Sequence, residues 1–195
     1  MFCCLPPDGV TVAFEYLCFA ACIQTAVHEL IGSEVDQVWI ANQLGISVSP
    51  TFDTSDLIAR GVTNVRRDSN PHNWGINPTG LTEALELAGL KITCDFHPIS
   101  HYQDWEFEDR LVELCDGRRF PIVGFDYNTL FGNLVTGDQG HCAVVYGHSK
   151  ERGRITFELH DPGPSRPGLI RVDSDRLYRA CRYKPGGVWV MRPTE

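Results

Sequence analysis

The sequence predicts one α+β domain in which helices come first and an antiparallel sheet follows. Helical apolar spacing dominates up to Gly117, strand patterns dominate after it, and 195 residues is the usual size of one domain. Hydrophobic residues make up 43% of the chain, which is enough for a sizeable core. We therefore expect a helical lobe over about residues 12–117 and a β lobe over about 118–193, with a cleft between them.

Helical apolar spacing predicts four helices in the first part, over residues 18–31, 33–45, 77–89 and 104–114. Gly32 stops the first helix, and Gly45 and Gly89 end the second and third, since glycine is the residue most often found at helix ends of this kind. Ser33 is expected to cap the second helix, with Asp36 three residues further on as in a capping box.

Residues 46–76 fit no regular pattern. The segment is polar and is interrupted by Pro50, Gly61, Pro71 and Gly75. We expect a long loop excursion, and a loop of this length is usually functional or mobile.

The second part of the chain predicts five strands, at residues 120–127, 141–148, 154–160, 169–172 and 188–191. Residues 150–153 (KERG) predict a hairpin turn between the second and third strands. Ile155, Phe157 and Leu159 alternate with polar residues, which indicates a strand with one buried face. A short helix is expected at 173–180.

Charge and composition argue against several classes of partner. The net charge of −8, without a basic stripe, argues against nucleic acid. No apolar run of about 18 residues predicts a membrane span. Residues 1–8 lack the basic and apolar regions of a signal peptide, so eight cysteines favour free thiols and a cytoplasmic location.

Three residues from separate elements predict nucleophilic catalysis. Cys18 opens the first helix, where free N–H groups and the helix dipole lower the pKa of a thiol. His141 begins a strand after a Gly-rich loop, and Asp161 ends the next strand. A thiol, an imidazole and a carboxylate in these places are a nucleophile, its base and the group that orients the base. We expect Asp161 to accept from Nδ1 of His141 and also to open a turn with Pro162 and Gly163.

The same residue types also occur without any catalytic role. A free cysteine is most often a small buried hydrophobic residue, and Cys18 could be one. Cys22 is the rival nucleophile, but it lies one turn deeper, where helix-terminal electrostatics fade. His160 alternates to the face opposite Asp161 and is left out of the site.

Neither a metal nor a cofactor is expected. The adjacent pair Cys3 and Cys4, and the four-residue spacing of Cys18 and Cys22, do not match the Cys-x-x-Cys pairs of zinc sites. The sequence has neither a Gly-x-Gly-x-x-Gly motif nor a P-loop for a nucleotide.

Four parts of the sequence carry a family resemblance, namely residues 18–21 (CFAA), the helices at 33–45 and 80–90, the pair 120–123 and 140–147 (GHCAVVYG), and 157–162 (FELHDP). Together they resemble papain-like cysteine peptidases, and most of all the bacterial peptidases that cleave bacteriocin leader peptides after a double glycine. The likeness covers roughly Val12 to Met191. It implies a papain-like two-lobe fold with the active site between the lobes. It also implies that Cys18 is the nucleophile, His141 the base and then the acid, and Asp161 the orienting residue.

One position departs from the family pattern. Members of the family commonly carry a glutamine about six residues before the cysteine, where its amide completes the oxyanion hole. Val12 stands there in this chain and cannot donate a hydrogen bond. Losing one such donor costs about 100- to 1,000-fold in kcat. Gln139 and Gln24 are the candidate substitutes.

Three functions follow from these observations. The first is a hydrolase that cleaves an amide bond through an acyl-cysteine intermediate, as a peptidase acting on a peptide or leader substrate. The second is an acyltransferase or peptide cyclase of natural-product biosynthesis that uses the same triad, with a carrier protein or precursor peptide as partner. The third is an inactive homologue that binds a peptide. Val12 favours the third, and the triad favours the first two.

Overall fold

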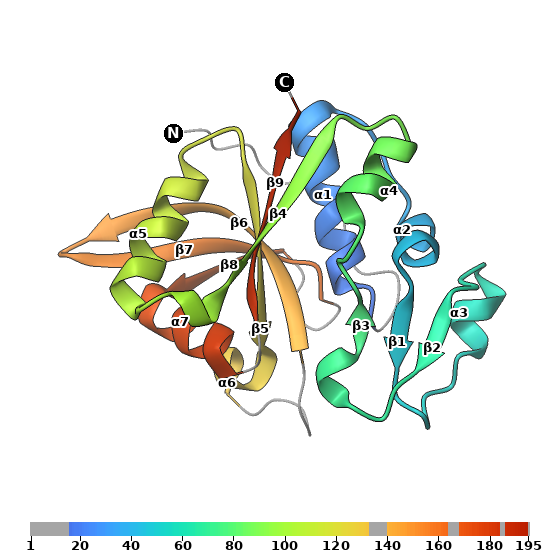
Figure 1. Ribbon diagram of the computed structural model, residues 1–195. Coiled ribbons are helices and arrows are strands. Elements are labelled where there is room, and N and C mark those ends of the chain that lie inside the picture. The colour runs from blue at the N-terminus through green and yellow to red at the C-terminus, as the bar shows by residue number, and fades with distance from the viewer. Residues whose placement is uncertain (1–15, 133–139, 164–167, 184–185, 195) are drawn as a thin grey trace.

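A computed structural model describes residues 16–132, 140–163, 168–183 and 186–194. The fold is α+β, as the sequence predicts, with one six-stranded sheet and one three-stranded sheet. Figure 1 shows the larger sheet in the middle of the molecule, with helices on both of its faces.

The six-stranded sheet is antiparallel throughout and has the order β4-β9-β5-β6-β7-β8. Its strands are β4 (Ile92–Pro98), β5 (Phe120–Asp126), β6 (Gly140–Glu151), β7 (Arg154–Asp161), β8 (Gly168–Asp173) and β9 (Gly187–Pro193). The predicted hairpin is confirmed, because β6 and β7 are adjacent and antiparallel. Arg152 and Gly153 form its turn with φ of 50° and 82°, the positive values that a tight hairpin turn requires.

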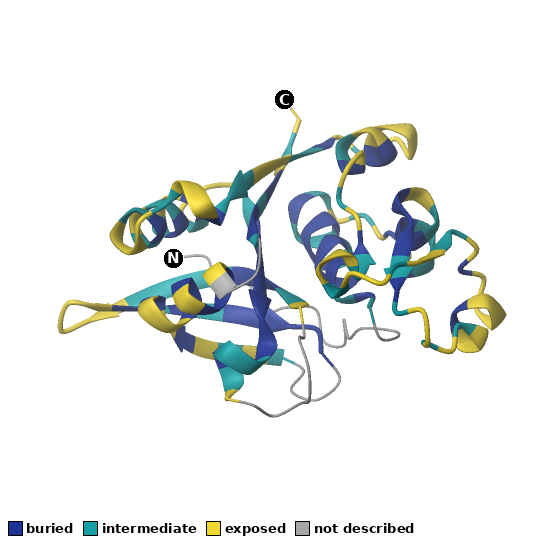
Figure 2. Ribbon diagram, turned by 60° about the horizontal axis from the view of Figure 1, so that its bottom comes forward, coloured by how far each residue is buried: buried dark blue, intermediate teal, exposed yellow. Residues whose placement is uncertain are grey.

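Helices cover the two faces of this sheet and enclose two hydrophobic cores (Figure 1). On one face lie α5 (Asp104–Cys115), α6 (Tyr127–Phe131) and α7 (Ser174–Tyr183), and on the other lies α1 (Cys18–Ile31). Along β6, Val144 belongs to the core with α1, whereas Ala143 and Val145 belong to the core with α5 and α7. Alternate residues of the strand therefore face opposite helices. In Figure 2 the buried residues follow the middle of the sheet, and the outer sides of the surrounding helices are exposed.

The first helix has the predicted bounds, and the second begins later than predicted. Gly32 ends α1 with a φ of 66°, the left-handed conformation that glycine adopts at little cost. The second helix, α2, spans Gln37–Leu44. Its cap is Asp36, whose side chain accepts from the N–H of Trp39 at 2.9 Å, so the prediction that Ser33 is the cap is wrong.

The third and fourth predicted helices are α4 and α5. Gly80 precedes α4 (Leu81–Leu87), which is shorter than the predicted 77–89 because the chain turns at Gly80 with a φ of 83°. The prediction of 104–114 agrees with α5, which is closed at its start by the reciprocal side-chain bonds of Gln103 and Glu106.

The prediction that residues 46–76 are a loop excursion is wrong. The segment contains β1 (Ile46–Val48), α3 (Ser55–Ala59), β2 (Val65–Arg67), the 3-10 turn η1 (Pro71–Asn73) and β3 (Gly75–Ile76). The strands form a sheet with the order β2-β1-β3. Ile46, Val48, Leu57 and Val62 are buried and join the core around α1. Strands of two or three residues are too short to show a period in the sequence.

The prediction that strands begin only after residue 117 is also wrong. The edge strand β4 pairs with β9 over its whole length, from Ile92 opposite Pro193 to Pro98 opposite Gly187. A second short 3-10 turn, η2 (Ile99–His101), leads from β4 toward α5. Asp95 and Phe96 are neighbours in this strand and both are exposed. The sequence therefore lacks the alternation of buried and exposed residues that marks a half-buried strand.

Candidate functional site

Cys18 is the first residue of α1, as predicted. Leu17, which precedes it, makes no side-chain hydrogen bond to the helix start. The first N–H groups of a helix have no partners within the helix and carry its positive partial charge. Leu17 and Phe19 are buried, whereas Cys18 is partly exposed. The thiol therefore lies at an open helix end that stabilises negative charge.

Strands β6 and β7 bring His141 and Asp161 together. Nε2 of His141 lies 2.5 Å from Oδ1 of Asp161, so the ring and the carboxylate are in hydrogen-bond contact. The Asp161 side chain is fully buried, and only 12% of the His141 side chain is exposed. The rings of Phe125 and Tyr127 meet the imidazole edge to face, with centroids at 5.5 and 5.4 Å. The imidazole is thus held by the carboxylate of Asp161 and by two aromatic rings.

The ring nitrogen that contacts Asp161 differs from the prediction. We expect Nδ1 from the sequence, but the structure has Nε2 at the carboxylate. A hydrogen bond also joins His141 and Cys18. With Nε2 occupied by Asp161, Nδ1 is the nitrogen that remains for the sulfur.

Asp161 fills both of the roles that its sequence context suggests. The oxygen that contacts His141 also accepts from the N–H of Gly163 at 2.7 Å, so the aspartate opens a turn as well. A Cβ at position 163 would lie 2.8 Å from Oδ1 of Asp161 and 3.2 Å from Nε2 of His141. Glycine at 163 therefore allows the turn to approach the imidazole–carboxylate pair closely.

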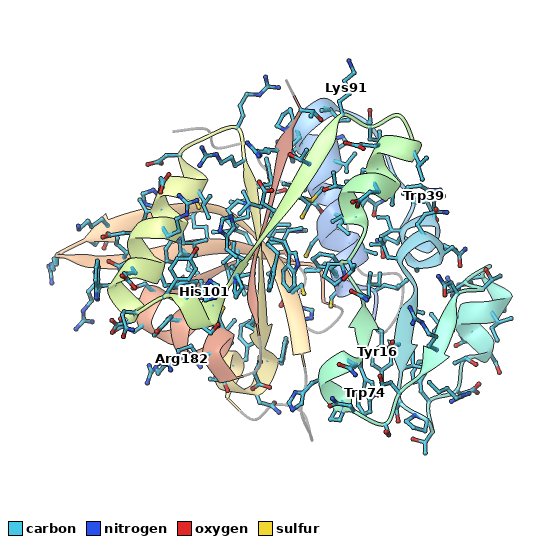
Figure 3. All side chains as sticks on the ribbon, viewed as in Figure 1. Tyr16, Trp39, Trp74, Lys91, His101 and Arg182 are labelled. Carbon is cyan, nitrogen blue, oxygen red and sulfur yellow. The ribbon has the colours of Figure 1, made fainter. Side chains whose placement is uncertain are left out.

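Cys18 and His141 line one cavity of about 540 Å³. The segment expected to be a loop supplies much of its wall, including Arg66, Asp68 and Trp74. Figure 3 shows Trp74 beside Tyr16 near β3, and their ring centroids are 6.2 Å apart. The volume lies within the range of sites that bind small ligands or parts of peptides.

The surroundings of Cys18 favour its thiolate. The hydrogen bond from the Cys142 thiol is the largest cause that lowers the pKa of Cys18 well below its ordinary value. Burial acts against it, while the hydrogen bond and positive charge of His141 add to the lowering. Burial alone would lower the pKa of His141, but its bonds to Asp161 and Cys18 and their negative charges raise that pKa to about 10. These shifts favour the thiolate of Cys18 together with the imidazolium of His141.

Cys142 is a site residue that the sequence did not predict. Its thiol and its backbone N–H both bond to the sulfur of Cys18. Strand alternation could have suggested it. If the side chain of His141 faces one side of the sheet, that of Cys142 faces the other, which is the side covered by α1.

Cys22, the rival nucleophile, and His160, which the sequence analysis leaves out of the site, have different surroundings. Cys22 is buried, and burial, followed by the charges of Cys18 and Asp161, raises its pKa well above the ordinary value. His160 packs against the ring of Tyr146, with centroids at 5.9 Å.

Gln24, a candidate oxyanion donor, does not reach the cavity. It lies six positions after Cys18 in α1, a rise of about 9 Å along the axis. Its side-chain oxygen accepts from Nε2 of Gln37 at 2.9 Å, which fixes it between α1 and α2. The other candidate, Gln139, lies outside the described residues, as do Val12, Cys3 and Cys4.

Comparison with protein-family models and with curated proteins finds no match to this chain. The geometry of the residues therefore carries the functional argument. Within the described ranges, no helix is long and apolar enough to cross a membrane. In the same ranges, no group of three or more His, Cys, Asp or Glu side chains is arranged to hold a metal ion.

Proposed function

We propose that the protein is a cysteine-nucleophile hydrolase that cleaves an amide bond, as a peptidase acting on a peptide or leader substrate. One observation carries the proposal. Cys18 at the start of α1 shares a cavity and a hydrogen bond with His141, and His141 bonds to the buried carboxylate of Asp161. A nucleophile, a base and a group that orients the base are the parts that acyl transfer through a thiol requires.

The reaction follows from the charge state of the pair. The Cys18 thiolate attacks the carbonyl carbon of the substrate, and the carbonyl oxygen becomes an oxyanion. The His141 imidazolium then gives its proton to the departing amine, which leaves an acyl-cysteine. His141, now neutral, takes a proton from water as the water oxygen adds to the acyl carbon. The C–S bond then breaks, the acid leaves, and Cys18 is again a thiolate beside an imidazolium. Asp161 holds the ring through Nε2 and stabilises its charged form in both steps.

The start of α1 also supports stabilisation of the oxyanion. The N–H groups of Cys18 and Phe19 belong to the first turn, so the helix itself does not use them as donors. Preorganised donors of this kind are the largest single contribution to many acyl transfers.

A papain-like arrangement of the whole chain is part of the same proposal. We infer a single domain over 1–195 with two lobes. The helices α1 to α4 and the three-stranded sheet form one lobe, and the six-stranded sheet forms the other. The contact of α1 with β6 supports this inference, since it joins Cys18 to the strand of His141. The cavity with Cys18 and His141 in its wall would then be the active-site cleft.

An activated ester tests the acyl-cysteine step without knowledge of the natural substrate. We expect p-nitrophenyl acetate to give a burst of one equivalent of p-nitrophenol and an acetyl group on Cys18, found by peptide mass spectrometry. Cys18→Ala should lose the burst, and Cys22→Ala should keep it.

A mixture of peptides tests the choice of an amide bond. The wild type should create new amino termini that Cys18→Ala does not create. Equal cleavage by Cys18→Ala, or acetylation at another residue, would refute the proposal.

A further inference from the structure

A second thiol adjoins the proposed nucleophile. Cys142 lies on β6, next to His141, and packs against the core that contains α1. Both Cys142 and Cys18 line the same cavity, and the two thiols are in hydrogen-bond contact. One sulfur comes from the start of α1 and the other from β6, the strand that this helix contacts.

The other described cysteines are poorer partners for Cys18. Cys22 is four residues along the same helix, where Cβ atoms are about 5–6 Å apart, and a disulfide needs about 3.5–4.5 Å. Cys181 is buried, and the partly exposed Cys94 and Cys115 are not in the wall of the cavity.

We propose that Cys18 and Cys142 form a reversible disulfide when the protein meets a hydroperoxide, and that this bond switches the nucleophile off. The inference rests on the proposed function, because it requires Cys18 to be a reactive thiolate. It adds a modification site to that function and assigns Cys142 a role as the resolving thiol.

The chemistry balances with hydrogen peroxide as the oxidant. The Cys18 thiolate attacks one peroxide oxygen, an S–O bond forms, the O–O bond breaks, and the departing hydroxide takes a proton from His141 and leaves as water. The Cys142 sulfur then attacks the sulfur of the Cys18 sulfenic acid, the S–S bond forms and the S–O bond breaks. The hydroxyl group takes the thiol proton of Cys142 and leaves as a second water. Two thiols are oxidised, and one peroxide is reduced to two waters.

The pKa of Cys142 should fall once Cys18 has been oxidised, which favours attack by Cys142 as the second step. Its hydrogen bond to Cys18 is the largest cause that raises the pKa of Cys142, followed by burial and by the charge of Cys18. Oxidation of Cys18 to an uncharged sulfenic acid removes that bond and that charge. The pKa of Cys142 then falls, which makes it a better nucleophile at the moment when it is needed.

The test is disulfide mapping of the full chain. The reduced protein is exposed to one equivalent of hydrogen peroxide with dimedone present to trap sulfenic acid, and free thiols are blocked with N-ethylmaleimide. We expect non-reducing peptide mass spectrometry to find a Cys18–Cys142 cross-link, which dithiothreitol reverses. Cys142→Ser should lose the cross-link and carry dimedone on Cys18. Cys94→Ser, a change outside the cavity, should form the cross-link as the wild type does.

Three results would overturn the inference, and they separate it from the proposed function. Dimedone on Cys18 in the wild type, without a cross-link, would leave a reactive nucleophile but no switch. A bond between Cys18 and any other cysteine, Cys3 and Cys4 included, would assign a different resolving thiol. An unmodified Cys18 in both the wild type and Cys142→Ser would refute the reactive thiolate itself. Circular dichroism of each variant shows whether its fold is intact.

Discussion

The first and second turns of α1 each present a cysteine, and the two thiols have opposite surroundings. The pKa of Cys18 is lowered by hydrogen bonds from Cys142 and His141, whereas burial raises the pKa of Cys22. Both residues come from the same helix, four positions apart. The residue type alone therefore does not decide which thiol reacts.

The facing strand decides the difference. Cys142 and His141 are neighbours on β6, at the place where that strand meets the start of α1, and both act on Cys18. Cys22 lies deeper in the core and receives only the unfavourable charges of Cys18 and Asp161. Reactivity is thus a property of the contact between α1 and β6. The predictions below alter that contact, from the largest effect to the smallest.

Replacing each cysteine of α1 by alanine should separate chemistry from packing. We expect Cys18→Ala to reduce ester turnover by about 10,000-fold or more, because no other group can form the acyl intermediate. Cys22→Ala should keep turnover and lose about 1 kcal/mol of unfolding free energy, since it only removes a buried sulfur. Turnover of p-nitrophenyl acetate and urea denaturation measure the two effects. Full activity in Cys18→Ala would end the account.

Asp161→Asn should weaken the base while the fold persists. We expect kcat/KM to fall by about 100- to 10,000-fold, because an amide can neither orient nor stabilise the imidazolium as the carboxylate does. The carboxylate raises the pKa of His141, so its loss should lower that pKa and move the alkaline limit of activity to lower pH. A pH profile with an unchanged alkaline limit would show that Asp161 acts only on structure.

Cys142→Ala should move the titration of Cys18. The hydrogen bond from Cys142 is the largest cause that lowers the pKa of Cys18, so its removal should raise that pKa. The alkylation rate should therefore reach its half-maximal value at a higher pH than in the wild type. Iodoacetamide rates across pH measure this shift, with Cys94→Ala as the control. An alkylation profile equal to that of the wild type would remove Cys142 from the site.

Gly163→Ala should disturb the imidazole–carboxylate pair by steric contact. The added Cβ would come within 2.8 Å of Oδ1 of Asp161, so the turn or the carboxylate must move. We expect a loss of about 1–3 kcal/mol of unfolding free energy and slower turnover. Gly147→Ala is the matched control, since its Cβ would have its nearest neighbour at 3.9 Å. Equal stability of the two variants would contradict the close approach.

Strong periodicity in the sequence predicts much of the framework. The bounds of α1 and α5 follow from apolar spacing, and the hairpin of β6 and β7 follows from alternation around the turn at 150–153. Short or exposed strands carry no such period, which is why β1 to β3 and the edge strand β4 escape prediction.

The site could be predicted as a set of residues but not as a set of contacts. The order of elements puts Cys18 at a helix start and His141 and Asp161 at neighbouring strand ends. Which nitrogen of His141 meets Asp161, and how near Cys142 lies to Cys18, depend on how α1 sits against the sheet. That packing is set by many side chains together, and no local pattern encodes it.

The pH dependence of iodoacetamide alkylation tests the central claim most directly. Each described thiol is followed separately by mass spectrometry, in the wild type and in His141→Ala. The account predicts that Cys18 reacts far faster than the other described thiols below about pH 7, and that it slows in His141→Ala as its pKa rises. A Cys18 that reacts as slowly as Cys22, or a rate that His141→Ala leaves unchanged, would contradict it.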